Sequence, residues 1–297
     1  MERQTGHTPA ERILLEAGLL RGCTRHAPGF YLGPAGECPK SLAPFRESNG
    51  VALSERAKIE LTTAHFETPI YERAVRAALA DMPPGPLREL GAGDGRITRM
   101  LLAHWTGPVL ACDCNQPALE RLYASLGQKE RQRVVILCCD ITDLPLPAAS
   151  VSGIVAIETL YYLGQEFEGT LVRLAAAMAP QGKLIHAEPT LEGWLLYCLA
   201  VDDWNSALVA AGDCAVEGHF RGFEPEEMER IYAECGLRLH EKTATPLTNL
   251  LLINRLVRSD LPKERQIDIT RRVRAGMNMC SVPRCIIYTA EPALSED

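Results

Sequence analysis

The sequence has 297 residues, of which 46% are hydrophobic and 23% are charged. These fractions are typical of a folded globular protein and exclude a disordered or collagen-like chain. The 31 lysines and arginines are outnumbered by 38 aspartates and glutamates, which gives a net charge of −7. An acidic chain offers no basic surface to neutralise phosphates, so neither nucleic acid nor an anionic membrane is an expected partner.

The 11 cysteines mostly lie inside apolar runs such as VLACDCN and VVILCCD. Such positions favour buried, reduced thiols over a disulfide framework. No uncharged stretch reaches the length of a membrane span, and the first residues, MERQTGHTPAERILLEAG, lack the apolar segment of a signal peptide. We therefore expect a cytoplasmic protein.

Residues 1–52 are interpreted as an N-terminal accessory region. A short amphipathic helix is expected over residues 9–20, followed by a stretch punctuated by glycine and proline. Cys23 and His26 stand at metal-ligand spacing, and Cys38 follows at a distance found in zinc ribbons, but a structural zinc site needs four ligands. Because no further Cys or His follows Cys38 closely, we expect a degenerate, ribbon-like segment without bound zinc.

A second unit, residues 53–297, begins with a helical pattern and continues from Pro86 as short apolar runs separated by helical patterns. This alternation is typical of βα units and predicts an α/β fold with a doubly wound parallel sheet, which binds ligands at the carboxyl ends of its strands. The expected strands are PLRELGAG, PVLACDCN, RVVILCCD, VSGIVAIE and KLIHAEP, and the expected helices cover residues 97–104, 117–126 and 167–178.

The alternation lapses after Pro189. Residues 190–223 contain Trp194, Trp204 and several other aromatic residues, which predicts an inserted lid or substrate wall. The expected elements that follow are a helix over residues 225–235, a strand in GLRLHEKTA, a helical insertion over residues 248–277 and a last strand in RCIIYTAEP.

The segment ELGAGDG ends the first strand of this alternation and opens a helix. Gly91, Gly93 and Gly95 allow a tight turn in which backbone N–H groups approach a ligand closely. Their spacing is G-x-G-x-G, whereas a dinucleotide site carries G-x-G-x-x-G. Glu89, two residues before the first glycine, would repel a pyrophosphate and suits a ligand with a positively charged amino group.

Two further acids follow the next two strands. Asp113 ends the second strand, where a carboxylate can accept hydrogen bonds from both hydroxyls of a ribose. Asp140 ends the third strand, where it can accept a bond from an adenine amino group, with Ile141 as an apolar neighbour of the ring. Each acid alone could be a helix cap, but acids at three successive strand ends favour a binding site.

On these motifs, the chain resembles the class I S-adenosylmethionine-dependent methyltransferases of small molecules over roughly residues 61–292. ELGAGDG resembles their glycine-rich loop, ACDCN their ribose-binding strand end, CCDITDLPLP their adenine-binding strand end, and RCIIYTAEP their antiparallel last strand. The resemblance implies a Rossmann-like sheet of seven strands and S-adenosylmethionine as cofactor. The implied binding residues are Glu89, Gly91, Ala92, Gly93, Gly95, Asp113, Cys114, Asp140, Ile141 and Ile157.

The residues after the fourth strand bear on the acceptor. The family's enzymes that methylate nucleic-acid bases often carry Asn/Asp-Pro-Pro-aromatic there, whereas this chain reads IETLYY. With the acidic charge, this favours a small-molecule acceptor. Candidates that could act on it are Glu158, Tyr161, Tyr162 and His219, with Glu188 after the fifth strand as a further carboxylate.

Each candidate also has an ordinary structural interpretation. Glu158 could position the cofactor or cap a helix, one of the two tyrosines could pack in the core, and His219 could lie in a surface loop. His186, inside an apolar strand, is interpreted as a core histidine with satisfied hydrogen bonds. Two other functions stay open, an NAD(P)-dependent oxidoreductase and a cofactor-binding subunit without catalysis, and so does a homodimer.

Overall fold

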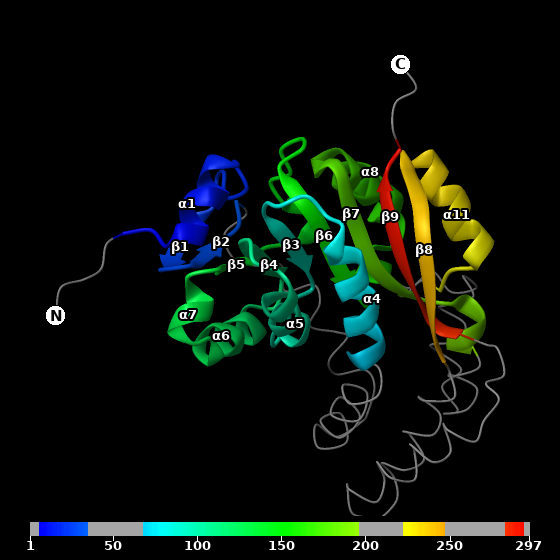
Figure 1. Cartoon of the computed structure of the whole chain (residues 1–297), viewed down its shortest axis with the longest axis horizontal. Helices are drawn as coiled ribbons and strands as arrows, with labels where there is room; N and C mark the ends of the chain where they lie inside the picture. The colour runs from blue at the N-terminus through cyan, green and yellow to red at the C-terminus, as the bar shows by residue number, and fades with distance from the viewer. Residues whose placement is uncertain (1–5, 35–67, 196–221, 247–282, 294–297) are drawn as a thin grey trace, which may run out of the picture.

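The computed structural model describes residues 6–34, 68–195, 222–246 and 283–293, and these residues form one mixed sheet with helices on both faces (Figure 1). Its strand order is β1-β2-β5-β4-β3-β6-β7-β9-β8. The strands are β1 Thr24–Ala27, β2 Phe30–Leu32, β3 Leu87–Leu90, β4 Val109–Asp113, β5 Val134–Cys138, β6 Val151–Ile157, β7 Met178–Pro189, β8 Leu237–Pro246 and β9 Pro283–Pro292.

The helices expected from the sequence are present wherever the structure describes them. They are α1 Pro9–Glu16, α4 Thr68–Ala80, α5 Arg96–His104, α6 Gln116–Ser125, α8 Phe167–Ala177 and α11 Pro225–Glu234. Three short elements were not predicted: α7 Gln128–Arg131 and the 3-10 helices η2 Ile141–Asp143 and η3 Leu160–Glu166. None of the described helices is both long and apolar enough to cross a membrane. The expected helical insertion, residues 248–277, lies outside the described residues.

The prediction of a seven-stranded sheet is wrong in its count, because the described sheet has nine strands. The two extra strands, β1 and β2, come from the N-terminal segment that was expected to be a degenerate, ribbon-like accessory region. β2 pairs in parallel with β5, and β1 pairs antiparallel with β2. Phe30 and Tyr31 are almost fully buried, so a run of only three apolar residues covers what would otherwise be an exposed sheet edge.

The predicted antiparallel last strand is confirmed. β9 lies between β7 and β8 and runs antiparallel to both. In contrast, β5, β4, β3, β6 and β7 are mutually parallel. The turns that follow these five strands therefore lie along one edge of the sheet, where the residues predicted to bind the ligand are located.

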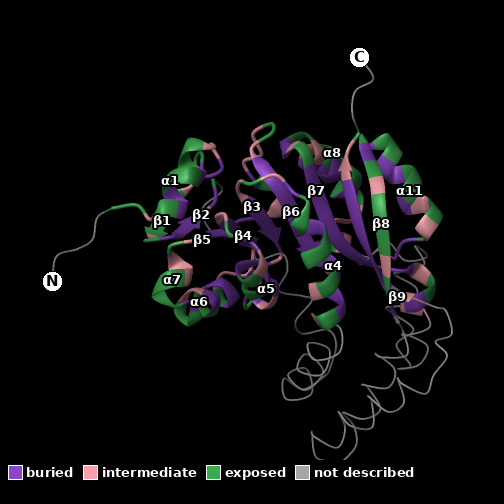
Figure 2. Cartoon of the chain, viewed as in Figure 1, coloured by how far each residue is buried: buried purple, intermediate pink, exposed green. Residues whose placement is uncertain are grey.

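The core has two layers, one on each face of the sheet. Helices α1, α8 and α11 pack on one face, and α4, α5 and α6 pack on the other. Side chains alternate between the two faces of a strand, so each strand contributes to both layers. In β5, Val135 and Leu137 belong to the first layer, and Val134, Ile136 and Cys138 belong to the second. Figure 2 shows the result as buried strands between helices whose outer faces are exposed. The parallel strands are apolar on both sides, as expected for a covered sheet.

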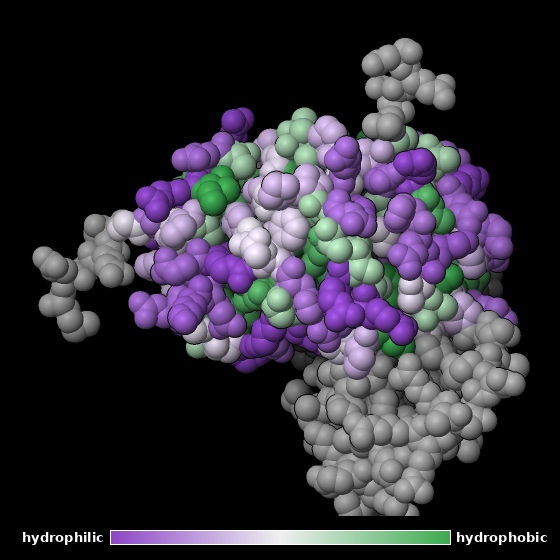
Figure 3. Space-filling view, viewed as in Figure 1, coloured by the Kyte–Doolittle hydropathy of each residue, from purple (hydrophilic) through white to green (hydrophobic). Residues whose placement is uncertain are grey.

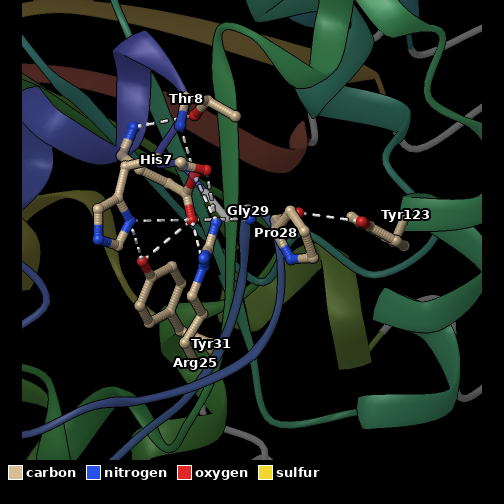
Figure 4. Close-up of polar contacts among 9 residues, drawn as sticks. His7, Thr8, Arg25, Pro28, Gly29, Tyr31 and Tyr123 are labelled. Atoms are coloured by element: carbon tan, nitrogen blue, oxygen red, sulfur yellow. Dashed lines mark hydrogen bonds and ion pairs between the residues drawn. The ribbon is translucent and has the colours of Figure 1, made fainter. Parts of the chain in front are cut away.

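A buried carboxylate attaches α1 to the β1–β2 hairpin (Figure 4). Glu11 is fully buried and accepts hydrogen bonds from the backbone N–H groups of Thr8 and Gly29, at 2.6 and 2.9 Å. Tyr31 Oη, at 3.0 Å, and Arg25 Nε, also at 3.0 Å, donate to the same carboxylate. Burial raises the pKa of Glu11, but the bonds from these four residues lower it to about 2.

Glu11 should make the stability of the protein sensitive to acid. Its pKa is about 2 in the folded chain against an ordinary 4.5, so its contribution is complete above pH 4.5 and is lost as the pH falls towards 2. We expect Glu11→Gln to lower the free energy of unfolding at pH 7 by about 1–3 kcal/mol, and the difference from wild type to shrink on acidification. Urea unfolding at several pH values measures this. The exposed Glu16→Gln, on the same helix, is the control, and a deficit that is independent of pH would contradict the assignment.

Candidate functional site

The glycine-rich loop connects β3 to α5 and can be built only with glycine at two positions. Gly91 and Gly95 have positive φ angles of 75° and 87°. A Cβ at Gly91 would lie 2.1 Å from Thr159 Oγ1, and a Cβ at Gly95 would lie 2.3 Å from Leu122 Cδ1. Gly93 also has a positive φ, but a Cβ there would meet no atom within 4 Å. The loop is therefore packed at both ends and open at its centre.

Asp113 lies beside this loop, as the sequence predicted for two adjacent strand ends. Its Oδ2 accepts a hydrogen bond from the Gly93 N–H at 2.7 Å, and its Oδ1 accepts one from the Asn115 N–H at 2.7 Å. The neighbouring backbone is fixed as well, because the Ala92 N–H donates to the Cys112 carbonyl at 3.0 Å. The carboxylate is thus held in one orientation while retaining acceptor capacity, since a carboxylate offers about four lone-pair positions.

Glu89 is buried under the loop with only 1% of its surface exposed. One carboxylate oxygen, Oε2, accepts a bond from Thr98 Oγ1 at 2.7 Å, whereas Oε1 has no hydrogen-bond partner among the described residues. Burial raises the pKa of Glu89 to about 7, with a further rise from Asp113 and an opposing effect of Thr98. A buried oxygen without a partner is costly, so it marks a position where a ligand donor fits.

Asp140 caps the short helix η2. Its Oδ1 accepts bonds from the Thr142 N–H at 2.9 Å and from Thr142 Oγ1 at 2.7 Å. Ile141 follows, half-buried and packed against the core. Asp140 therefore has a helix-capping role. It lies at the same sheet edge as Asp113, because β4 and β5 are neighbouring parallel strands.

Two arginines that the sequence analysis missed hold the loop after Asp140. Arg173 of α8 donates to the Thr142 carbonyl at 2.6 Å and to the Leu144 carbonyl at 3.0 Å, and Arg88 of β3 donates to the Pro145 carbonyl at 2.8 Å. Arg88 is fully buried. An arginine inside the buried strand LREL was the signal that could have revealed this contact.

Glu158 follows β6 and forms an ion pair with Arg96, the first residue of α5, which is the helix after the glycine-rich loop. Its Oε2 lies 3.3 Å from a terminal nitrogen of Arg96, and its Oε1 lies 4.0 Å from Cys285 Sγ. Glu158 has a φ of 55°, which is unusual for a residue with a side chain. Its N–H donates to the Ala187 carbonyl at 3.1 Å, so the strand end holds this conformation in place. Ile157, one residue earlier, is buried.

Tyr161 and Tyr162 lie in η3 with ring centroids 4.2 Å apart. The Tyr161 N–H donates to Glu188 Oε2 at 2.9 Å, and Tyr162 is 41% exposed. On the face shown in Figure 3, hydrophobic side chains of the described elements form small separate patches. Burial raises the pKa of Tyr161 well above its ordinary value.

His186 is a core histidine, as predicted, and it links Glu188 to α11. His186 Nδ1 lies 2.8 Å from Glu188 Oε1, and its Nε2 bonds the hydroxyl of Tyr232. All three side chains are buried. Burial lowers the pKa of His186 to about 3 and raises that of Glu188 well above its usual range. Through its bond from the Tyr161 N–H, Glu188 holds the backbone of η3 in place.

The remaining candidates are placed only in part. Cys114, after β4, is half-buried. Of the two tryptophans in the predicted lid, Trp194 lies within the described ranges and Trp204 lies outside them. His219 and Cys38 lie outside the described residues. Within those residues, no group of three or more histidine, cysteine or acidic side chains is arranged to hold a metal ion.

Part of the chain matches a known protein family. Residues 88–182 match the family model described as a methyltransferase domain. This part of the chain is similar to methyltransferase domains. The match begins in β3 and ends within β7, so it includes the glycine-rich loop and the turns after β4, β5 and β6. No curated protein sequence matches the chain significantly.

Solved structures share the methyltransferase fold. A geranyl diphosphate methyltransferase in complex with S-adenosylmethionine superposes with a TM-score of 0.55 at 16% identity, covering 83% of this chain and 93% of that one. An S-adenosylmethionine-dependent methyltransferase from Mesorhizobium loti gives 0.51 at 16% identity, with coverages of 74% and 97%. The [4+2]-cyclase SpnF gives 0.53 at 12% identity, with coverages of 75% and 81%. At these identities the likeness concerns the fold, and the cyclase shows that the fold alone does not set the reaction.

Glu89 should reduce the stability of the protein at neutral pH. Its folded pKa of about 7 exceeds the ordinary 4.5, so stability falls as the pH rises through that window and stays lower above pH 7. We expect Glu89→Gln, which cannot ionise and keeps an acceptor for Thr98, to raise the free energy of unfolding at pH 8 by about 1–3 kcal/mol. The gain should vanish near pH 4.5.

Denaturant unfolding at pH 4.5, 6 and 8 measures this difference, with the exposed Glu120→Gln of α6 as the control. A Glu89→Gln protein that is less stable than wild type at every pH would show that the ionised carboxylate supports the fold.

Proposed function

We propose that this chain is an S-adenosylmethionine-dependent methyltransferase that transfers the methyl group to a small-molecule acceptor. The observation that carries the proposal is the contact between the open centre of the glycine-rich loop and the oriented Asp113 carboxylate, with the buried, unpartnered Glu89 oxygen beneath the same loop. The matched methyltransferase domain covers all three features.

The chemistry of these residues fits the cofactor part by part. Asp113 can accept bonds from the ribose hydroxyls, and Glu89 can receive the ammonium group, which is a donor for its free oxygen. Gly91, Ala92, Gly93 and Gly95 would bring the backbone close to the amino acid end. Asp140 and Ile141 would face the adenine, while Cys114 and Ile157 would line the adenosine and methyl ends of the same sheet edge.

The sulfonium of the bound cofactor supplies an activated methyl group for an in-line displacement. The chain then has to align the acceptor and exclude water, and alignment alone can be worth up to about 7–11 kcal/mol in favourable cases. Deprotonation of the acceptor contributes roughly 10²–10⁴-fold where a base is used. Glu158 is our candidate for that base, because it follows β6 directly and lies at the exposed sheet edge.

The acceptor side is assigned to η3 and the predicted lid. Tyr162 is exposed, and the backbone of Tyr161 is fixed by Glu188, so an aromatic wall can be held rigidly there. Residues 190–223, with His219, are proposed from the sequence as the further part of the acceptor side, although residues 196–221 lie outside the described ranges. A small molecule is favoured over nucleic acid because the net charge of −7 provides no phosphate-binding surface.

The domain division and cellular location are part of the same proposal. Residues 53–297 would form the catalytic domain and residues 1–52 an accessory region whose β2 is integrated into the sheet. The cysteines in the described part of the chain form no disulfide with one another, which supports a reducing, cytoplasmic location.

The proposed function is tested by binding of S-adenosylhomocysteine to wild type and to Asp113→Ala. The variant removes two charge-assisted hydrogen bonds to the ribose, each worth about 1.5–3 kcal/mol, so calorimetry should show at least a roughly 100-fold weaker affinity. Asp143→Ala, after the third strand end, is the matched control and should bind normally.

The same titration with NADH separates the rival cofactor. No binding of S-adenosylhomocysteine together with micromolar binding of NADH would reject the methyltransferase and favour an oxidoreductase.

A further inference from the structure

Strand β2 of the N-terminal segment runs along β5 as far as the turn that carries Asp140. The two strands pair in parallel, with Leu32 opposite Cys138, the last residue of β5. Directly after β2, the Gly33 N–H donates to the Cys138 carbonyl at 2.8 Å. The N-terminal segment therefore bonds to the chain two residues before Asp140.

The end of β5 is held from both sides, because β5 lies between β2 and β4 in the sheet. On the side of β2 it accepts the bond from Gly33. On the side of β4, the Cys139 N–H donates to the Asp113 carbonyl at 3.1 Å. The backbone that leads into Asp140 is thus fixed by the hairpin and by the strand of the proposed ribose site together.

Gly33 approaches this turn too closely for any residue with a side chain. A Cβ at Gly33 would lie 2.4 Å from Cys139 Cβ and 3.3 Å from the Cys138 carbonyl oxygen. Carbon atoms in contact lie about 3.5–4.0 Å apart, so the first distance is a collision. Gly33 does not have a left-handed φ. The close approach, and not the backbone conformation, therefore requires glycine here.

The same hairpin contacts the helix that follows Asp113. The Tyr123 hydroxyl, on α6, donates to the Pro28 carbonyl in the turn between β1 and β2 at 2.9 Å (Figure 4). The buried Glu11 holds this turn from the other side by accepting the N–H of the next residue at 2.9 Å. One hairpin thus touches both the helix after Asp113 and the backbone that leads into Asp140.

We propose that the β1–β2 hairpin is part of the cofactor site and that Gly33 is a positioning residue for the adenine. This inference rests on the proposed function, in which Asp140 accepts a hydrogen bond from the adenine amino group. Thr142 donates to Oδ1 of Asp140, and no described residue donates to its Oδ2. The hairpin acts through the strand end that precedes Asp140. It lies outside the matched methyltransferase domain, which begins at residue 88.

The experiment measures how well the site distinguishes adenine from hypoxanthine. S-adenosylhomocysteine carries the adenine amino group, and S-inosylhomocysteine carries a carbonyl oxygen in its place. Calorimetry gives the ratio of their dissociation constants for wild type, Asp140→Ala, Gly33→Ala and Gly6→Ala. The matched control is Gly6→Ala, because a Cβ at Gly6, on the same N-terminal segment, would meet no atom within 4 Å.

We expect wild type to prefer S-adenosylhomocysteine by roughly 10- to 100-fold, the effect of one hydrogen bond to a charged group. Asp140→Ala should reduce this preference to less than about threefold. Gly33→Ala should also reduce it, by about fivefold or more, because the added methyl group displaces Cys139 and with it Asp140. Gly6→Ala should retain the preference. The double variant Gly33→Ala/Cys139→Gly, which removes the colliding Cβ, should recover it.

A second measurement needs no variant and decides the question if Gly33→Ala fails to fold. If the hairpin positions the site, ligand binding must in turn stabilise the hairpin, because coupling between two sites is reciprocal. In wild type, S-adenosylhomocysteine should slow hydrogen exchange of the Gly33 and Ile136 N–H groups, which join the hairpin to β5, more than that of Cys235. Cys235 follows α11, at the other end of the sheet.

An unchanged preference in Gly33→Ala would overturn the inference, even if both ligands bind more weakly, because the hairpin would then contribute to stability alone. The same holds for an unchanged preference in Asp140→Ala, for a double variant without recovery, and for equal slowing of exchange at Gly33 and Cys235. In each case S-adenosylhomocysteine still binds and the proposed function stands. If wild type does not bind S-adenosylhomocysteine, the proposed function itself fails.

Discussion

The hydrogen bond from the Gly93 N–H to Asp113 Oδ2 joins the ends of β3 and β4, and the candidate site depends on it. The parallel pairing of these strands brings the loop and the carboxylate together, with Leu90 opposite Cys112. The bond can form only if the loop makes its tight turn, which the contacts at Gly91 and Gly95 restrict to glycine. Any side chain at those two positions would therefore move the loop away from Asp113.

Two buried acidic residues, Glu11 and Glu89, differ in the number of hydrogen bonds that they accept and in their pKa. Glu11 stabilises the fold by accepting bonds from several donors, and its pKa is low. Glu89, with one donor and one oxygen that has no hydrogen-bond partner among the described residues, has a raised pKa, and we propose that it binds the cationic group of the ligand. The difference is the one expected between a structural and a functional acid, because a site that must receive a ligand leaves part of its hydrogen bonding unsatisfied.

The sequence predicted the parts of the fold that local patterns determine. The five parallel strands, their helices and the antiparallel β9 were predicted because apolar runs and helical patterns alternate clearly. β1 and β2 were missed, since a three-residue strand between glycines has no readable period and is stabilised only by pairing with β5. The Arg96–Glu158 pair was missed for a related reason: 62 residues separate its members, and only the folded sheet brings them together. Whether the predicted site residues contact the cofactor remains a prediction.

The most direct test of the central claim, that the edge formed by the glycine-rich loop and Asp113 holds the cofactor, is a crystal structure with S-adenosylhomocysteine. Our account predicts both ribose hydroxyls at hydrogen-bond distance, about 2.5–3.0 Å, from the Asp113 carboxylate, with the amino acid end over Gly91 to Gly95. Ordered S-adenosylhomocysteine bound elsewhere, with Asp113 contacting only Gly93 and Asn115, would contradict it.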